Sequence, residues 1–391
     1  MSVRSRQEYT RQVSKRYVDA NRKEKSRILD EFVMTSGYNR KYALTLLNSP
    51  PQPRTQPIRR PRSRIYSSEV KKALLLVWQA SHGLCGKRLA PYVGPMVEAL
   101  VRAGEIELVP SVRDRLVKIS ASTIDRLLKE EKQLPIRGRT LTKPGTLLRR
   151  QIPVRTFADW HESEHRPGFC EVDLVAHCAE NTAGDFLYTL TLTDVFTGWT
   201  LPIALANRSQ ETVHLAIKKA RALLPFPLLG LDSDNGTEFI NHLLNRYCQA
   251  EKITFTRCRP YKKNDQCRVE QKNWSVVRQY VGYQRLEGEA ALNCLNQVYA
   301  PLRLHVNYFQ PSLKLVSKER DRAKVLKRYD TAKTPYQRLL AAGQLAEHRQ
   351  AQLKELYLSL NPLDLTRQIQ AALDELGDPK VRFFDEATKA A

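Results

Sequence analysis

The segment from residue 169 to 283 changes its apolar period several times, and this order restricts the fold more than any other feature. FCEVDLVAH (169–177) alternates as a strand does, and DFLYTLTLTDVFTGWTLPIAL (185–205) indicates a hairpin that turns at Thr197-Gly198. Helical segments then alternate with two short apolar strands, LLGLDS (228–233) and ITFTRC (253–258). Three antiparallel strands followed by alternating helices and strands predict a mixed sheet with helices on both faces.

Three carboxylates lie at key places in this order. Asp173 is in the middle of the first predicted strand, where an unpaired charge is costly to bury. Asp234 ends a later strand, and Glu270 falls on the following helix, with 35 residues between the two. Hard oxygen ligands from these elements suit two magnesium ions, with Asp173 bridging both. The predicted chemistry is phosphodiester cleavage.

Other acids near these positions compete for the same role. Asp232 gives a spacing of 37 residues to Glu270, and we expect its side chain on the other face of the strand. We expect Glu238 in the first turn of a helix, where a carboxylate favours the helix dipole. Asp194 reads as a turn residue, and Asp265 reads as a helix cap, with Asn264 as the competing cap.

The chain is strongly basic. Lys and Arg number 64 against 41 acidic residues, the net charge is +23 and the pI is about 9.8. Such an excess indicates a polyanionic partner. Nucleic acid fits better than a membrane, because no apolar run approaches the roughly 20 residues that span a bilayer. The N-terminus lacks the apolar segment of a signal peptide, so we expect a cytoplasmic protein.

The seven cysteines are scattered, and none forms a Cys-x-x-Cys pair. Reduced cytosolic thiols are therefore expected. His161 and His165 precede Cys170 and Cys178, which leaves zinc as a weaker alternative. The two cysteines are separated by seven residues and run into a predicted strand, which is not a usual zinc-ligand spacing.

At 391 residues the chain exceeds one compact core, so we expect two to four domains. Residues 1–48 read as a helix-turn-helix DNA-binding domain with a break at Gly37. Tyr42 is expected to face inward, and the predicted DNA contacts are Arg40, Lys41 and Thr45. The alternative is an ordinary helical hairpin with solvated charges.

Residues 49–65 are a basic, Pro-rich linker. Its arginines, Arg59 and Arg60 among them, either follow DNA phosphates or only keep an extended tether soluble.

Residues 66–132 read as a second helical, helix-turn-helix-like domain. Ser120 or Ser122 caps its last helix, and Thr123 and Arg126 are expected outside as DNA contacts. Residues 133–165 form a second basic linker, which is long for a structureless connection. Residues 313–391 are predicted to be a basic and helical C-terminal region.

Residues 169–312 resemble the retroviral-integrase-type catalytic core that bacterial insertion-sequence transposases share, the DDE superfamily. The likeness rests on EVDLV, LTDVFTGW, DSDNGTEF, RPYKKNDQCRVEQKN and LHVNYFQPS. It implies an α/β ribonuclease H-like core at 166–312, flanked by all-α helix-turn-helix domains and a helical C-terminal region. It also implies that Asp173, Asp234 and Glu270 are the catalytic, metal-binding acids.

One feature departs from the retroviral pattern, in which the helix with the catalytic glutamate carries basic residues about one and two turns later. Here these positions hold Trp274 and Val277. Trp274 reads as a core residue, with stacking on a splayed base as the alternative. The DNA contacts expected in their place are Lys262, Lys263, Arg268 and Lys272.

The resemblance implies a DNA transposase or integrase of the bacterial nucleoid. Such an enzyme binds terminal inverted repeats in double-stranded DNA, cleaves with two Mg²⁺ ions (Mn²⁺ substituting) and joins 3′-hydroxyl ends to target DNA. Two ends must meet, so a homodimer or tetramer on DNA is expected, and a helper ATPase is a further candidate partner. The alternatives are a sequence-specific DNA-binding regulator with a silent core and a simple ribonuclease H-like nuclease.

Overall fold

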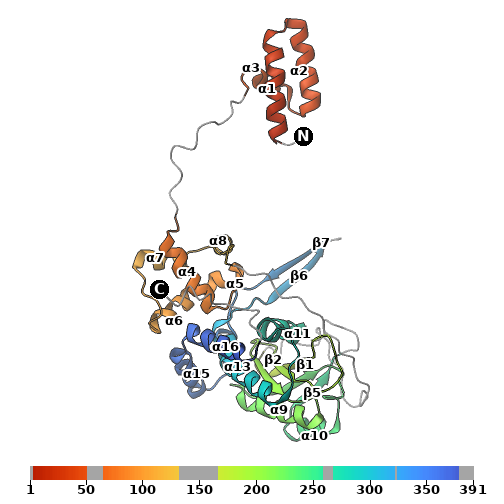
Figure 1. Cartoon of the computed structure of the whole chain (residues 1–391), viewed down its shortest axis with the longest axis vertical. Helices are drawn as coiled ribbons and strands as arrows, with labels where there is room; N and C mark the ends of the chain where they lie inside the picture. The colour runs from red at the N-terminus through yellow and green to blue at the C-terminus, as the bar shows by residue number, and fades with distance from the viewer. Residues whose placement is uncertain (1–2, 51–64, 132–165, 259–266, 322–323, 378–391) are drawn as a thin grey trace. The chain divides into compact units, whose positions relative to one another are not determined.

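The computed structural model of the chain describes residues 3–50, 65–131, 166–258, 267–321 and 324–377. The chain divides into two compact units, Met1–Ile65 and Tyr66–Ala391. Figure 1 shows the helices of the first unit in red and those of the second from orange to blue.

The first unit contains the helices α1 (Val3–Asp19), α2 (Arg22–Ser36) and α3 (Arg40–Asn48). Asn21 and Glu24 form a capping box at the start of α2, because each side chain accepts a hydrogen bond from the other residue's backbone N–H. The helix ends at Gly37, whose φ of 71° is a left-handed conformation that favours glycine.

The three helices enclose a small apolar core. Its buried members are Val13, Tyr17, Leu29, Phe32, Ala43 and Leu47. The inward orientation predicted for Tyr42 is wrong, since this side chain is 53% exposed. Its ring instead lies edge-on against Tyr38.

The second unit begins with a helical segment. Its elements are α4 (Ser68–Ala80), α5 (Gly86–Leu89), η1 (Ala90–Tyr92), α6 (Val93–Arg102), α7 (Pro110–Val117) and α8 (Ala121–Leu127). Ser120 is the N-cap of α8, and its hydroxyl accepts from the Thr123 N–H. Of the two predicted caps, Ser120 and Ser122, the first is therefore confirmed.

Five of the described strands form one sheet in the order β3-β2-β1-β4-β5. They are β1 (Phe169–Ala176), β2 (Tyr188–Asp194), β3 (Thr200–Leu205), β4 (Gly230–Ser233) and β5 (Thr254–Arg257). β1, β2 and β3 pair antiparallel, whereas β4 and β5 pair parallel. The predicted ribonuclease H-like order is therefore confirmed.

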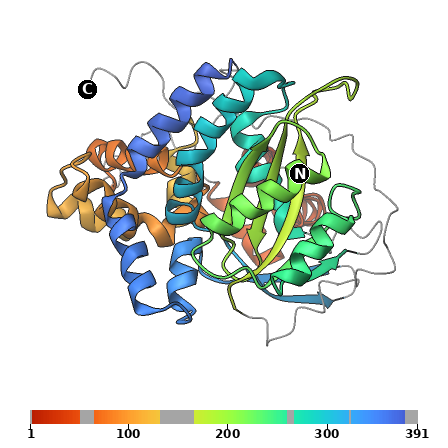
Figure 2. The ribbon, with the colours of Figure 1, turned by 90° about the horizontal axis from the view of Figure 1, so that it is seen from below.

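Helices cover this sheet on both faces (Figure 2). Every residue of β2 is buried, which requires cover on each side. The helices around the sheet are α9 (Gln210–Leu223), α10 (His242–Ala250), α11 (Cys267–Lys272), the π-helix η4 (Asn273–Arg278), α12 (Gln279–Val281) and α13 (Gly288–Phe309). No helix in the described part of the chain is long and apolar enough to cross a membrane.

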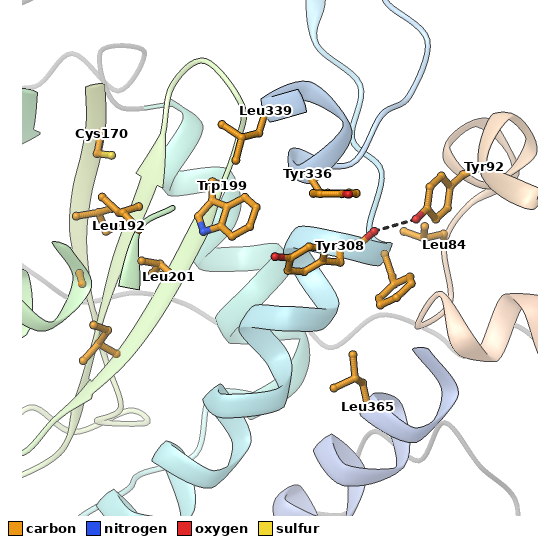
Figure 3. Close-up of a cluster of buried hydrophobic side chains, with 14 of the residues drawn as sticks. Leu84, Tyr92, Cys170, Leu192, Trp199, Leu201, Tyr308, Tyr336, Leu339 and Leu365 are labelled. Carbon is orange, nitrogen blue, oxygen red and sulfur yellow. Dashed lines mark hydrogen bonds between the residues drawn. The ribbon is translucent and has the colours of Figure 1, made fainter. Parts of the chain in front are cut away.

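The helical segment and the sheet share one apolar core, which differs from the separate domain that the sequence predicted at 66–132. The Tyr92 hydroxyl donates to the Tyr308 carbonyl oxygen at 2.8 Å (Figure 3). Tyr308 also packs against Trp199 at the start of β3 and against Tyr336 from the C-terminal region. The aromatic side chains thus join three parts of the sequence in one unit.

The C-terminal region is only partly helical. Its helices are α14 (Pro335–Ala341), α15 (Glu347–Ser359) and α16 (Pro362–Glu375), and they follow an antiparallel hairpin of β6 (Leu315–Asp321) and β7 (Lys324–Tyr329). The helical region predicted at 313–391 is therefore wrong for Leu315–Asp321 and Lys324–Tyr329, which are strands. Clustered Lys and Arg concealed the alternation of this segment.

Two glycines test the close packing of α5 on α8. A Cβ at Gly86 would lie 2.1 Å from the Ala121 carbonyl oxygen, whereas a Cβ at Gly94 in α6 would meet nothing within 4 Å. We expect Gly86→Ala to lower the free energy of unfolding by about 1–3 kcal/mol. Gly94→Ala should raise it by up to about 1 kcal/mol, because alanine is the better helix former. Thermal unfolding of both variants measures these changes in stability. Equal changes in the two variants would contradict the close packing of α5 on α8.

Candidate active site

β1 presents Glu171 and Asp173 to the same face of the sheet, because residues two apart in a strand share a face. α11 and η4 cover this face and contact both side chains. The parallel register pairs Val172 with Ser233 at the end of β4. Asp173 in the middle of β1 and Asp234 directly after β4 are the next residues in this register, so they come side by side on neighbouring strands.

The Asp173 carboxyl is strongly perturbed. Burial raises its pKa to about 8, and the charges of Asp234 and Glu270 add to this effect. Two hydrogen bonds oppose the shift, one from the Leu174 N–H at 2.8 Å and one from Asn273 Nδ2 at 2.6 Å. The charges of Asp234 and Glu270 therefore both act on Asp173.

Asp234 follows β4 in a tight turn. Burial raises its pKa to about 6, opposed by a hydrogen bond from the Gly236 N–H, and the charge of Glu238 adds to the rise. A Cβ at Gly236 would lie 2.7 Å from the Glu238 carboxyl carbon, so glycine leaves room for this turn. The Asn235 amide donates to the Cys258 carbonyl oxygen at 2.9 Å, which ties the turn to the end of β5.

Glu270 is exposed on α11, and a buried carboxylate fixes the start of that helix. Glu171 accepts from the Arg268 N–H at 3.0 Å, the Val269 N–H at 2.9 Å and Arg268 Nη1 at 2.9 Å. Burial raises the pKa of Glu171, and the positive charge of Arg268 opposes this. Glu171 thus holds the helix that carries Glu270 against the strand that carries Asp173.

Asn273 is a site residue that the sequence reasoning missed. Its Nδ2 donates to Asp173, and its Oδ1 is buried with no hydrogen-bond partner among the described residues. The signal was its position three residues after Glu270, which places both on one helix face. The π-helix that begins at Asn273 falls directly at this site, where such irregular turns are frequent.

The competing acids have structural roles. The expectation that alternation turns Asp232 to the other face is wrong, because residues two apart share a face. Asp232 is instead buried within β4 and accepts from Thr256 Oγ1 at 2.6 Å across the ladder. Glu238 precedes α10 and is not in its first turn, since the helix begins at His242. Asp194 is a turn residue as predicted, and it accepts from the Thr197 N–H and hydroxyl.

Two predicted DNA contacts on α11 differ in their surroundings. The Arg268 guanidinium pairs with buried Glu171, which does not fit the predicted phosphate contact. Lys272 is half-buried, and its pKa falls to about 7 because of burial and the nearby charges of Arg88, Arg338 and Lys314. A bound anion would favour the charged form of Lys272.

The predicted contacts in the two helical regions lie at the surface to different degrees. Lys41, Thr45 and Arg126 are exposed, and Thr123 is half-buried. Arg40 is exposed as well, but its guanidinium forms an ion pair with Asp30. Several predicted residues lie outside the described residues, namely Arg59, Arg60, His161, His165, Lys262, Lys263, Asn264 and Asp265.

Trp274 contradicts the expectation that it packs in the core. Its side chain is 47% exposed, whereas Val277 on the same π-helix is fully buried. The ring therefore lies at the surface four residues after Glu270.

Within the described ranges, no three His, Cys, Asp or Glu side chains lie close enough together to hold a metal ion. Asp173 and Asp234 lie on neighbouring strands, and Glu270 is exposed on α11. All three donors are carboxylates, the ligand type that Mg²⁺ prefers.

Comparison with known proteins places this site in a family. Residues 163–263 match the model of the integrase core domain. The uncharacterized protein y4rM of Sinorhizobium fredii is 42% identical over 340 residues, which cover 86% of this chain and 96% of the relative.

Solved integrase cores are more distant. The magnesium complex of the HTLV-2 integrase catalytic core is 17% identical, with 38% of this chain and 91% of that chain covered and a TM-score of 0.29. The BIV integrase catalytic core is also 17% identical, with 45% and 95% covered and a TM-score of 0.28. Because y4rM matches nearly along its whole length and the integrase core domain model spans the sheet with Asp173 and Asp234, the chain belongs to the integrase-type family with a ribonuclease H-like core.

Proposed function

We propose that this protein is a DNA transposase or integrase. It cleaves phosphodiester bonds at the ends of a mobile element and joins the freed 3′-hydroxyls to target DNA. The integrase core domain supports polynucleotidyl transfer in general. The observation that carries the proposal is that Asp173 in the middle of β1 lies beside Asp234, which directly follows β4, and that the charge of Asp234 raises the pKa of Asp173.

The site residues fit a divalent cation. The charge of Asp234 raises the cost of ionising Asp173, and a cation held by both carboxylates would lower this cost. The unpartnered Asn273 Oδ1 beside Asp173 adds a further oxygen without a donor. Two Mg²⁺ ions, or Mn²⁺ in their place, would lower the pKa of the attacking water or hydroxyl and stabilise the leaving oxygen.

The chain's own residues orient this chemistry. Asn273 holds one oxygen of Asp173, and the Leu174 N–H holds the other, so the carboxylate plane is fixed. The Gly236 N–H fixes one oxygen of Asp234. Glu270 completes the ligand set from α11, and Glu171 sets the position of that helix.

The DNA contacts follow from the exposed cations. Lys41, Thr45 and Arg126 offer donors on the two helical regions, and Lys272 offers an ammonium beside Glu270. Trp274 offers an exposed ring face on which a splayed base can stack. Two DNA ends must be held together, so we assign the active form to a dimer or tetramer on double-stranded DNA.

A strand-transfer assay tests this function. Protein is mixed with a labelled duplex that carries the element end and a supercoiled target, with Mg²⁺ or Mn²⁺. We expect joined product from the wild type and a loss of at least about 100-fold for Asp173→Asn, Asp234→Asn and Glu270→Gln, because each removes a metal ligand.

The same assay separates the competing functions. Nicking without joining would favour a simple nuclease, and tight end binding without chemistry would favour a regulator with a silent core. Asp232→Asn is the matched control, since it changes a neighbouring aspartate whose buried carboxylate accepts from Thr256 Oγ1.

The raised pKa of Asp173 predicts a pH-dependent stability. The folded-state pKa is about 8 against an ordinary value of 3.8, so between these pH values the folded protein keeps a proton that the unfolded chain has released. The free energy of unfolding should therefore fall as pH rises from about 4 to about 8, by on the order of 1–2 kcal/mol since the side chain keeps some contact with water.

Thermal unfolding of wild type and Asp173→Asn, in EDTA at both ends of this range, measures the effect. The variant should be the more stable of the two at pH 8, and Mg²⁺ should restore only the wild type. If the stability of the two proteins changed with pH in the same way, the raised pKa of Asp173 would be contradicted.

Glu171 predicts a separate loss of activity. In Glu171→Gln the charge that pairs with Arg268 is gone while one amide oxygen still accepts from the α11 backbone. Displacing Glu270 should lower the joining rate about 10- to 100-fold and raise the Mg²⁺ concentration needed for half-maximal rate. Affinity for the DNA end should stay near that of the wild type.

The Mg²⁺ dependence distinguishes positioning from simple destabilisation. Breaking a buried ion pair costs about 3–5 kcal/mol, so the assay is run well below the variant's melting temperature. If the rate falls only in proportion to the folded fraction, with an unchanged Mg²⁺ dependence, Glu171 has no positioning role.

A further inference from the structure

The β6–β7 hairpin is an isolated two-stranded ribbon. Its strands pair with each other, and Figure 1 shows it extending away from the sheet and helices of its own unit. Such a ribbon alone is marginally stable in water. Its exposed apolar side chains are Leu315, Val316, Val325, Leu326 and Tyr329.

The register gives the hairpin two different faces. One face carries the pairs Leu315–Tyr329, Lys318–Lys327 and Arg320–Val325, and the opposite face carries Ser317–Arg328 and Glu319–Leu326. The first set is called the basic face here, because its described side chains include three cations and no acid. Glu319 is on the other face.

Lys318 and Lys327 lie directly opposite each other in the ladder. Like charges at such positions destabilise a hairpin. Among the described residues, neither ammonium forms an ion pair with a carboxylate. The sequence thus keeps an unfavourable cation pair on an exposed ribbon, which an external anion would stabilise.

The base of the hairpin is firmly attached. Lys314 and Asp330 close it with two hydrogen bonds, from the Lys314 N–H to Asp330 Oδ1 at 2.7 Å and from the Asp330 N–H to the Lys314 carbonyl oxygen at 3.0 Å. Arg338 from α14 donates to Asp330 Oδ2 at 2.7 Å, and Lys314 Nζ donates to the Val195 carbonyl oxygen at 3.1 Å. The ribbon is therefore held by the turn between β2 and β3.

We propose that the basic face of the β6–β7 hairpin is a DNA-binding ribbon. The major groove of duplex DNA admits a two-stranded ribbon of this kind. Lys318 and Lys327 contact phosphates, and the apolar side chains of the same face lie against sugars and base edges. The choice of DNA as the polyanion rests on the proposed function. The charge and exposure of the basic face are observed independently of it.

Salt-dependent binding of the full chain to a labelled duplex of arbitrary sequence tests the proposal, in EDTA so that no chemistry occurs. Lys318→Ala/Lys327→Ala should reduce the slope of log K against log salt by about 1.8, since each phosphate contact contributes about 0.9. Lys327→Ala alone should reduce it by about 0.9. Arg328→Ala is the matched control, because it removes one cation from the next residue on the opposite face.

Three outcomes overturn the proposal. If the double variant keeps the wild-type slope, Lys318 and Lys327 do not contact phosphates. If Arg328→Ala reduces the slope as much as Lys327→Ala does, the effect reflects net charge only. A changed sedimentation state with an unchanged slope assigns the ribbon to a second copy of the chain. Strand transfer by the same variants reports separately on the proposed function, because a protein that never joins DNA can still show the predicted slopes.

Discussion

The contact between Glu171 and the start of α11 decides whether the carboxylates of this core can meet. A carboxylate that accepts two backbone N–H groups and one guanidinium fixes both the position and the direction of a helix end. The buried ion pair therefore gives specificity to the site rather than stability to the fold.

Carboxylate repulsion is then the second constraint. Burial and neighbouring charges raise the pKa of Asp173 and Asp234 together, so without a cation the site has a high cost of full ionisation. The two carboxylates cannot easily move apart to reduce their repulsion, because β1 is hydrogen-bonded to β2 on one side and to β4 on the other. A carboxylate pair held on two inner strands of a sheet is suited to bind a divalent cation.

Sequence reasoning worked where a local pattern carries the information. The alternation of β1–β3 and the turn after Asp234 were readable along the chain. Glu171 and Asn273 escaped it because their partners are set by tertiary packing and not by spacing. Trp274 and the hairpin at 315–329 escaped it for another reason, since apolar residues that remain exposed look like core residues in a sequence.

The hairpin and the catalytic helix share one electrostatic environment. Lys314 and Arg338, which fix the hairpin base, both act on Lys272, two residues after Glu270. Their charges favour the neutral form of Lys272, and a phosphate placed among them favours the charged form instead. A DNA backbone that reaches from the ribbon to α11 would therefore bind more strongly at each place because of the other. If the proposals hold, the like-charged cations of this region would hold one continuous polyanion across both places.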